Sequence, residues 1–553
     1  MDKRFFLALL LTGVVVVLTP ALFPRPASPP PLTAPDSVFR PTDALRDPAG
    51  AGASAATATK RPLNGARLAR DTGLRVAVDT VEVRTAKGAL FFSTHGATPL
   101  AVRVDSYPAL NGTGGRVILR HGNDPLLRYR VVTSGDTLAV DATTFRATRD
   151  SSVAGAHTLT FSGETARGEA SITYQIPRDD YLSAVRVRFA GVQGTSFLLV
   201  DLPTGFDTQE ADSVGDLRLL AYSVKPTTRG ARGTAFASLD AGETKFEPGP
   251  LSWAVAKSKY FLVGLLAPEK GPGFAEAHLT GGPRTQKAAR NGAATIVVPL
   301  QDGAAAFELY AGPQSWERLH RIGREFETAN PYGGWLQPVV QPFSTIVMRV
   351  LLWMKKAVRL DYGWVLVIFG VAVRLLMWPL NQTAMRTSLR MQRIQPELQE
   401  VQRKHKSDPA KQQQEIMRVY KEHGMSPFSA FSGCLPALIP MPVLMALFFV
   451  FQNTIEFRGV SFLWLHDISL HDPLYILPLF MGVTMFALSW IGMRNMPPNP
   501  QSKMISYMLP VMLTVFLLQS AAGLSLYYTV QNLAALPQQW LIANERARAK
   551  QPA

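Results

Sequence analysis

The chain has 553 residues, of which 47% are hydrophobic and only 18% are charged, against roughly 25% charged residues in soluble domains. Its 57 Lys and Arg against 41 Asp and Glu give a formal net charge of +16. This composition excludes a chain that is disordered throughout. The single cysteine, Cys434, excludes an intramolecular disulfide, a cysteine-based zinc site and a cysteine-ligated iron–sulfur cluster. The more apolar half, residues 335–553, is also the more basic one, which is typical of membrane proteins with basic inner loops.

The N-terminus predicts a membrane anchor. Residues 1–23 begin with Met1-Asp2-Lys3-Arg4 and continue as an apolar run close to the roughly 20 residues that span a bilayer. Because no small-x-small cleavage site ends the run, we expect an uncleaved transmembrane helix; a cleaved signal peptide is the alternative. Residues 24–62 are rich in Pro, Ala, Ser and Thr and are predicted to form an extended linker.

Residues 63–334 are predicted to form a large β-sandwich domain. Short alternating runs such as Ile172, Tyr174 and Ile176 recur between glycine-containing turns, and this period of two is typical of half-buried antiparallel strands. A helix is expected near the end of the domain, from Gln314 to Asn330. The histidines of this region have no metal-ligand spacing and no acid/base pair converges, so we expect neither a catalytic residue nor a metal site nor a cofactor; the histidines are His95, His121, His157 and His278.

The sequence of residues 335–360 predicts an amphipathic helix, because charged residues interrupt its apolar run. On a helix, Arg349, Lys356 and Arg359 fall within an arc of about 80°, with apolar residues facing away. We expect an interfacial helix that lies in the membrane surface and turns this basic stripe toward lipid headgroups. The alternative is an ordinary amphipathic helix packed on the β domain.

Residues 361–381 form the first strong span after the anchor, and they contain Arg374. In a helix this residue lies about 16 Å from Gly363, which is half of the roughly 30 Å hydrocarbon thickness. An arginine facing lipid there costs about 2.5–3.5 kcal/mol or more. Arg374 is therefore expected to face a polar partner or a water-filled cavity; an arginine that snorkels from near the helix end is the alternative.

Residues 382–425 predict a cytoplasmic helical hairpin. Apolar residues recur at roughly heptad spacing, and Ser407-Asp408-Pro409 supplies a cap residue followed by a proline at the first helical position, which starts a second helix. A solvated charged face is the default interpretation of such a stretch. Its nine Lys and Arg also suit anionic lipid or ribosomal RNA.

Residues 430–542 are predicted to hold four further spans, and residues 543–553 a basic cytoplasmic tail. Several of these spans are short or contain proline, which suggests a thin membrane body. With an inside N-terminus and six spans, the basic loops fall in the cytoplasm and the β domain falls outside.

Polar residues gather in the last two spans. Gln519, Tyr527, Tyr528, Gln531 and Asn532 lie near or within membrane depth, and residues three or four apart share a helix face. Hydrogen bonding between helices, or an interfacial position for the tyrosines, is the ordinary explanation. Together with Arg374, they favour a hydrated pocket.

Several segments in this order resemble the YidC family of membrane protein insertases, in the Oxa/Alb superfamily. The resemblance covers about residues 335–545, and the large outer β domain is similar to that of Gram-negative members. Gly370 is a departure, since some members have a groove threonine there. The segments are FGVAVRLLMWPL at 369–380, GCLP at 433–436, DPLYILP at 472–478 and GLSLYY at 523–528.

The resemblance implies a bacterial inner-membrane insertase and chaperone that is not an enzyme. A hydrophilic groove would hold Arg374 and receive the polar flank of a nascent inner-membrane protein, which then moves into lipid. The ribosome, the Sec translocon and membrane lipids are the implied partners. Two other hypotheses remain open: a transporter or channel for an anionic solute, and a membrane-tethered enzyme whose β domain binds sugars.

Overall fold

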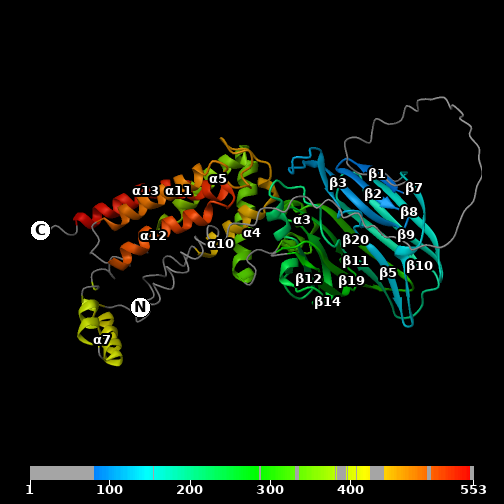
Figure 1. The fold of residues 1–553 in the computed structure, drawn as a ribbon, viewed down its shortest axis with the longest axis horizontal. Helices are drawn as coiled ribbons and strands as arrows, with labels where there is room; N and C mark the ends of the chain where they lie inside the picture. The colour runs from blue at the N-terminus through cyan, green and yellow to red at the C-terminus, as the bar shows by residue number, and fades with distance from the viewer. Residues whose placement is uncertain are drawn as a thin grey trace, which may run out of the picture. The chain divides into compact units, whose positions relative to one another are not determined.

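The computed structural model describes residues 80–152, 155–285, 288–330, 336–379, 382, 394, 397–406, 408–423, 441–494 and 500–548. The predicted anchor and linker lie outside these residues, as do residues 549–553 of the predicted tail. The described chain consists of a strand-rich part up to residue 313 and a helical part from residue 337 (Figure 1).

The strand-rich part contains two main antiparallel sheets. The small sheet has the order β1-β2-β3-β4, and the large sheet has the order β6-β5-β11-β19-β16-β14-β15-β20-β10-β9-β8-β7, with β12 between β13 and β14. A short β17–β18 pair stands apart. The strands are β1 Thr80–Thr85, β2 Gly88–Ser93, β3 Thr98–Pro108, β4 Arg116–Leu119, β5 Arg128–Thr133, β6 Asp136–Leu138, β7 Arg146–Asp150, β8 Ala156–Thr165, β9 Gly168–Pro177, β10 Leu182–Phe189, β11 Ser196–Asp201, β12 Ala221–Pro226, β13 Arg232–Ala235, β14 Thr244–Lys257, β15 Phe261–Leu266, β16 Phe274–Gly281, β17 Arg284–Thr285, β18 Ala288–Ala289, β19 Gly292–Leu300 and β20 Ala304–Pro313.

The predicted alternation on β9 is confirmed. Ile172, Tyr174 and Ile176 are buried, while the residues between them are partly exposed. Tyr174 joins the two sheets, because its ring lies 4.8 Å from that of Phe92 on β2 and its hydroxyl donates to the carbonyl of Ala97 at 2.8 Å. A buried tyrosine with a bonded hydroxyl adds packing without leaving a polar group unpaired.

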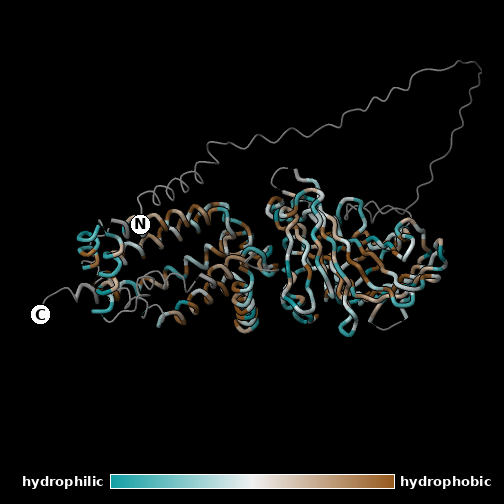
Figure 2. Tube along the Cα trace, turned by 90° about the horizontal axis from the view of Figure 1, so that it is seen from below, coloured by the Kyte–Doolittle hydropathy of each residue, from teal (hydrophilic) through white to brown (hydrophobic). Residues whose placement is uncertain are grey.

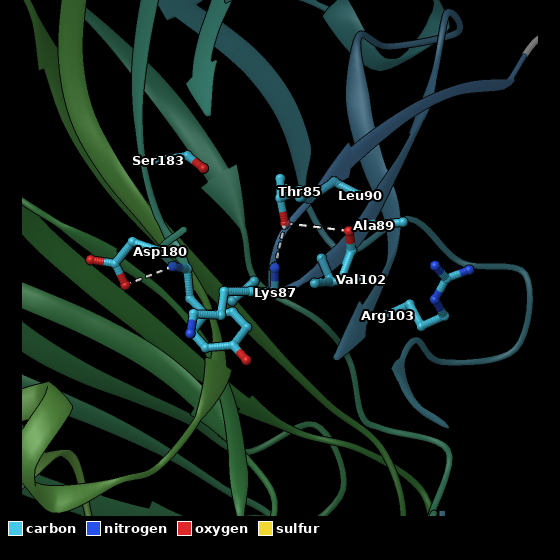
Figure 3. A pocket seen from close by; sticks show the side chains of 11 residues that line it. Thr85, Lys87, Ala89, Leu90, Val102, Arg103, Asp180 and Ser183 are labelled. Carbon is cyan, nitrogen blue, oxygen red and sulfur yellow. Dashed lines mark hydrogen bonds between the residues drawn. The ribbon is translucent and has the colours of Figure 1, made fainter. Parts of the chain in front are cut away.

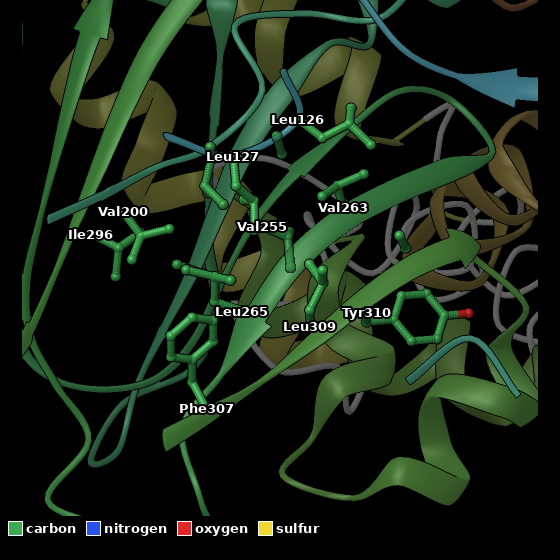
Figure 4. Close-up of a cluster of buried hydrophobic side chains, with 14 of the residues drawn as sticks. Leu126, Leu127, Val200, Val255, Val263, Leu265, Ile296, Phe307, Leu309 and Tyr310 are labelled. Carbon is green, nitrogen blue, oxygen red and sulfur yellow. The ribbon is translucent and has the colours of Figure 1, made fainter. Parts of the chain in front are cut away.

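A continuous apolar core fills the space between the strands. Figure 4 shows side chains from several strands meeting there, among them Val255, Val263 and Leu309. The inward positions of β15 and the facing strands are almost entirely apolar, so burial of these side chains supplies the main stabilisation of this part.

The helix predicted from Gln314 to Asn330 is wrong as a single element. The structure has a short helix, α3 Trp316–Ile322, and then a 3-10 helix, Phe326–Ala329. Between them Gly323 takes a φ of 83°, in the left-handed region. A glycine adopts this conformation at no steric cost, and it commonly ends a helix.

Eight other α-helices are described. Those with more than ten residues fall in segments predicted to be helical, and α13 continues past residue 542 into the predicted tail. They are α2 Ser213–Arg218, α4 Gln337–Val358, α5 Tyr362–Leu376, α7 Pro409–Glu422, α10 Met441–Asn453, α11 Ile476–Met493, α12 Pro500–Leu517 and α13 Ala522–Arg548.

The predicted start of the second hairpin helix is confirmed. Asp408 caps α7, and its Oδ1 accepts hydrogen bonds from the backbone N–H groups of Ala410 and Lys411, at 3.2 and 3.1 Å. Pro409 occupies the first turn, where its missing N–H costs nothing. The two helical stretches of the hairpin bury a small apolar cluster between them: Ile394, Leu398, Val419 and Tyr420.

The long helix α13 packs against both α5 and α11. A Cβ at Gly370 of α5 would lie 3.0 Å from Cγ1 of Val530, so the absent side chain allows α5 and α13 to approach closely. Hydropathic colouring shows hydrophobic stretches along several of the helices, and mixed colouring along the strands (Figure 2).

Among the described residues, only α11 is both long and apolar enough to cross a bilayer. The apolar helical stretches Tyr362–Leu376, Leu444–Asn453 and Ser506–Leu517 are shorter. The six spans therefore stay a prediction.

Candidate functional site

Arg374 lies in the last turn of the apolar helix α5, with a half-buried side chain. Its Nη2 donates a hydrogen bond to Oε1 of Gln538 on α13, at 2.8 Å. Its Nε is buried and has no hydrogen-bond partner in the described part of the chain. No carboxylate described by the structure forms an ion pair with it. Arg374 lies near the end of α5, as the snorkelling alternative expects. However, the hydrogen bond to Gln538 holds its guanidinium against α13.

Gln538 was not predicted as a site residue. It is buried, with 1% of its surface exposed, and its Nε2 donates to the backbone carbonyl of Trp378, just after α5, at 3.3 Å. A helix-periodicity argument finds it, because it lies two turns after Gln531 and therefore on the same face of α13.

Gln531 also connects α13 to α5. Its Nε2 donates to the carbonyl of Gly370 at 3.0 Å and to the hydroxyl of Tyr527 at 2.9 Å. The ring of Tyr527 is buried against Phe369, with centroids 5.8 Å apart. The structure therefore brings Gln531, Tyr527 and Arg374 to one contact between two helices.

Asn532 faces a different helix. Its Nδ2 donates to Oγ1 of Thr484 at 3.2 Å and to the carbonyl of Met481 at 3.4 Å, both on α11. Asn532 therefore forms hydrogen bonds between helices, which is the ordinary explanation for a polar residue in a span.

Gln519 lies away from the Arg374 contact, before the start of α13. Gln519 is exposed in the turn before α13. Gln538, the partner of Arg374, lies about 24 Å along α13 from the first residue of that helix. The structure therefore does not bring Gln519 to Arg374. Tyr528 is partly buried, with its ring 5.6 Å from that of Tyr527.

Two basic residues of α4 contact α3. Lys356 donates to Oε1 of Glu317 at 2.7 Å, and the guanidinium of Arg349 lies over the ring of Trp316 at 5.6 Å. Arg359 follows the end of α4 in a left-handed conformation. The contacts of Lys356 and Arg349 favour the alternative in which α4 packs on the β domain. The side chain of Trp353 on α4, which is 67% exposed, favours the interfacial helix instead.

Comparisons with known proteins cover both parts of the chain. Residues 80–346 match the family model described as "YidC periplasmic domain", and residues 353–550 match "60Kd inner membrane protein". A membrane protein insertase YidC from Anaeromyxobacter dehalogenans is 31% identical over 402 residues, which are 72% of this chain and 71% of that protein. The chain belongs to the YidC family of membrane protein insertases.

Another YidC insertase, from Chlorobaculum tepidum, is 30% identical over 66% of this chain and 64% of its own length. A solved structure described as an active YidC insertase with its first transmembrane domain resolved is 18% identical over 84% of this chain and 93% of that chain, at a TM-score of 0.34, too slight a likeness to bear on the fold. Family membership confirms the predicted function: this is a membrane protein insertase of the inner membrane, with a β-rich periplasmic domain and a C-terminal helical region.

Buried polar and aromatic side chains meet where the periplasmic domain contacts the loop between α10 and α11. We call them the junction cluster; its residues are Glu210, Tyr260, Phe261, Glu456 and Arg458. Nε of Arg458 donates to both carboxylate oxygens of Glu210, at 3.0 and 2.8 Å, with side chains 1% and 6% exposed. The guanidinium also lies over the rings of Phe261 and Tyr260, at 5.6 and 6.0 Å. Burial raises the pKa of Glu210 although Arg458 opposes this.

Glu456 completes the junction cluster without a cationic partner among the described residues. Its Oε1 accepts a hydrogen bond from the backbone N–H of Trp316 at 3.2 Å, and its Oε2 is buried with no described partner. Burial, with a smaller contribution from the nearby Glu317, raises the pKa of this carboxyl to about 7.

The periplasmic domain shows no site for a metal in its described residues. Figure 3 shows a cavity bordered by Thr85, Lys87 and Asp180. Its volume of about 10 Å³ has room for one water at most, so it is too small for a sugar or another organic ligand.

Proposed function

We propose that this insertase works through a hydrophilic groove centred on Arg374. The observation that carries the proposal is a half-buried guanidinium in an apolar helix, bonded to an amide with no described carboxylate partner. Because a cation facing lipid costs about 2.5–3.5 kcal/mol or more, its persistence favours a hydrated setting. The polar flank of a nascent inner-membrane protein would bind there transiently, without covalent chemistry.

The apolar part of the incoming segment would move along exposed helix surfaces into lipid. Large apolar side chains on three helices support this path: Leu376 on α5 is 77% exposed, Val483 on α11 is 65% exposed and Phe516 on α12 is 60% exposed. Short apolar helices also support a thinned membrane around the groove.

The topology we propose has six spans: residues 1–23, residues 361–381 and four within 430–542. Both termini and the hairpin lie in the cytoplasm, since the basic loops then fall inside. The nine basic residues of the hairpin and the basic tail would contact the ribosome. We propose the Sec translocon as a second partner, and membrane lipids as the partner of the exposed apolar side chains of α4.

The groove is tested by Arg374→Ala. Losing charge-assisted hydrogen bonds of about 1.5 kcal/mol to the substrate flank is expected to reduce insertion of a single-span reporter with an acidic translocated flank roughly tenfold. Insertion is measured in cells depleted of their own insertase, by protection of the translocated flank from protease.

The matched control is Arg494→Ala. Arg494 follows the end of α11 and lies over the ring of Trp490 at 6.0 Å, so it samples a similar residue at a helix end. It is expected to leave insertion unchanged. Full activity of Arg374→Ala with several acidic-flank reporters would overturn the groove.

A further inference from the structure

Arg374 has more donors than its described partners accept. Arginine carries five N–H donors; among the described residues, a single acceptor, Oε1 of Gln538, bonds Nη2, and the buried Nε has none. Nη2 is thus fixed and Nε is closed off by burial, whereas Nη1 has no described acceptor.

Gln538 uses both ends of its amide. Oε1 accepts from Arg374 at 2.8 Å and Nε2 donates to the carbonyl of Trp378 at 3.3 Å. Only this orientation works, because the opposite one would point a donor at a donor and an acceptor at an acceptor. The side chain is 1% exposed, so its geometry is held by packing as well as by these bonds.

The backbone contact determines where the guanidinium is held. Trp378 follows Met377, the residue that caps α5, and carbonyls at a helix end lack partners within the helix. By bonding this carbonyl and Arg374 together, Gln538 fixes the arginine relative to the end of α5 and to α13.

We propose that Gln538 is the positioning residue of Arg374: it holds Nη2 of the guanidinium without neutralising the charge, and leaves the other terminal nitrogen, Nη1, for the substrate flank. This inference rests on the proposed groove. A glutamate at the same position would pair with the cation and cancel its charge, whereas a neutral amide fixes the side chain and preserves its attraction for carboxylates.

The first test is a double-mutant cycle of Arg374→Ala and Gln538→Leu in the full-length protein. With Arg374 present, Gln538→Leu is expected to reduce insertion of the acidic-flank reporter about threefold, the size typical of interhelical hydrogen bonds. In the Arg374→Ala background it is expected to have no further effect, because coupled residues are not additive. Thermal unfolding of the four purified proteins in detergent is expected to show the same coupling.

The second test changes charge while keeping a hydrogen bond. Gln538→Glu is expected to reduce insertion of the acidic-flank reporter as much as Arg374→Ala does, and to leave a matched reporter with an uncharged flank unchanged. A merely structural residue would affect both reporters equally. Gln538→Asn, which retains the amide, is expected to recover part of the loss seen with leucine.

The control is Gln539→Leu on the neighbouring position. Its Nε2 lies 2.5 Å from where a Cβ at Gly492 of α11 would be, so this glutamine is turned toward α11. It is expected to show no coupling with Arg374. Additive effects of Arg374→Ala and Gln538→Leu, or equal losses with both reporters, would overturn the role of Gln538 alone; an Arg374→Ala variant with full activity would overturn the groove and this inference with it.

Discussion

Replacing Arg458 with alanine is expected to destabilise the contact between the periplasmic domain and the α10–α11 loop by about 3–5 kcal/mol, since the substitution leaves the partner of a buried ion pair uncompensated. Glu210 would remain buried, with its carboxylate deprived of both hydrogen bonds from Arg458. The lost stacking on Phe261 adds to the effect. Thermal unfolding of the purified protein in detergent, and its susceptibility to trypsin, measure the change.

Two variants separate burial from charge. Arg128→Ala breaks an exposed pair with Asp124, whose nitrogen and oxygen lie 3.0 Å apart and whose side chains are 45% and 50% exposed; it is expected to cost less than about 1 kcal/mol. Combining Arg458→Met with Glu210→Gln removes both charges and retains volume, so it is expected to recover much of the stability. Equal effects of Arg458→Ala and Arg128→Ala would contradict the prediction.

Local signals in the sequence predicted the elements well where each residue's environment depends on its neighbours. The alternation around Tyr174 predicted a strand with one buried face, and Asp408 followed by Pro409 predicted the start of a helix. The single helix expected over Gln314–Asn330 was wrong because the pattern of apolar residues continues through Gly323, whereas the backbone turns there.

The candidate site was predicted in part. Arg374 was chosen because a cation in an apolar helix requires a polar setting, and Gln531 because it shares a membrane depth with other polar residues. Gln538 was missed, although its spacing from Gln531 places it on the same helix face. Gln519 was included because composition alone does not reveal how far along a helix a residue lies from Arg374.

The junction cluster could not be predicted from the sequence. Glu210 and Arg458 are separated by 248 residues, and each lies in a loop with no periodic pattern. Their pairing depends on how the periplasmic domain folds and on the path of the α10–α11 loop, so no local signal connects them.

Acidification is expected to strengthen the same junction through Glu456. Burial raises the pKa of this carboxyl to about 7, whereas an unfolded glutamate has a pKa of about 4.3. The folded state therefore holds the proton more tightly. The contribution of Glu456 to stability is fully present below the unfolded pKa and is lost as the pH rises through about 7. A difference of this size corresponds to roughly 4 kcal/mol between the two ends of that range.

Glu456→Gln isolates this contribution. The amide retains an oxygen that can accept from the N–H of Trp316 but does not titrate, so the variant is expected to unfold at a higher temperature than the parent at pH 8 and at a similar temperature at pH 5. Unfolding is measured at pH 5, 6, 7 and 8.

Other titratable groups near Glu456 are Tyr107, Tyr362 and Glu317, and they remain in both proteins. Glu400→Gln on the hairpin is the control: the hydrogen bond from Lys404 lowers the pKa of Glu400, so its stabilising effect is lost only at more acidic pH. If the parent and Glu456→Gln had parallel curves, Glu456 would not be the group that titrates.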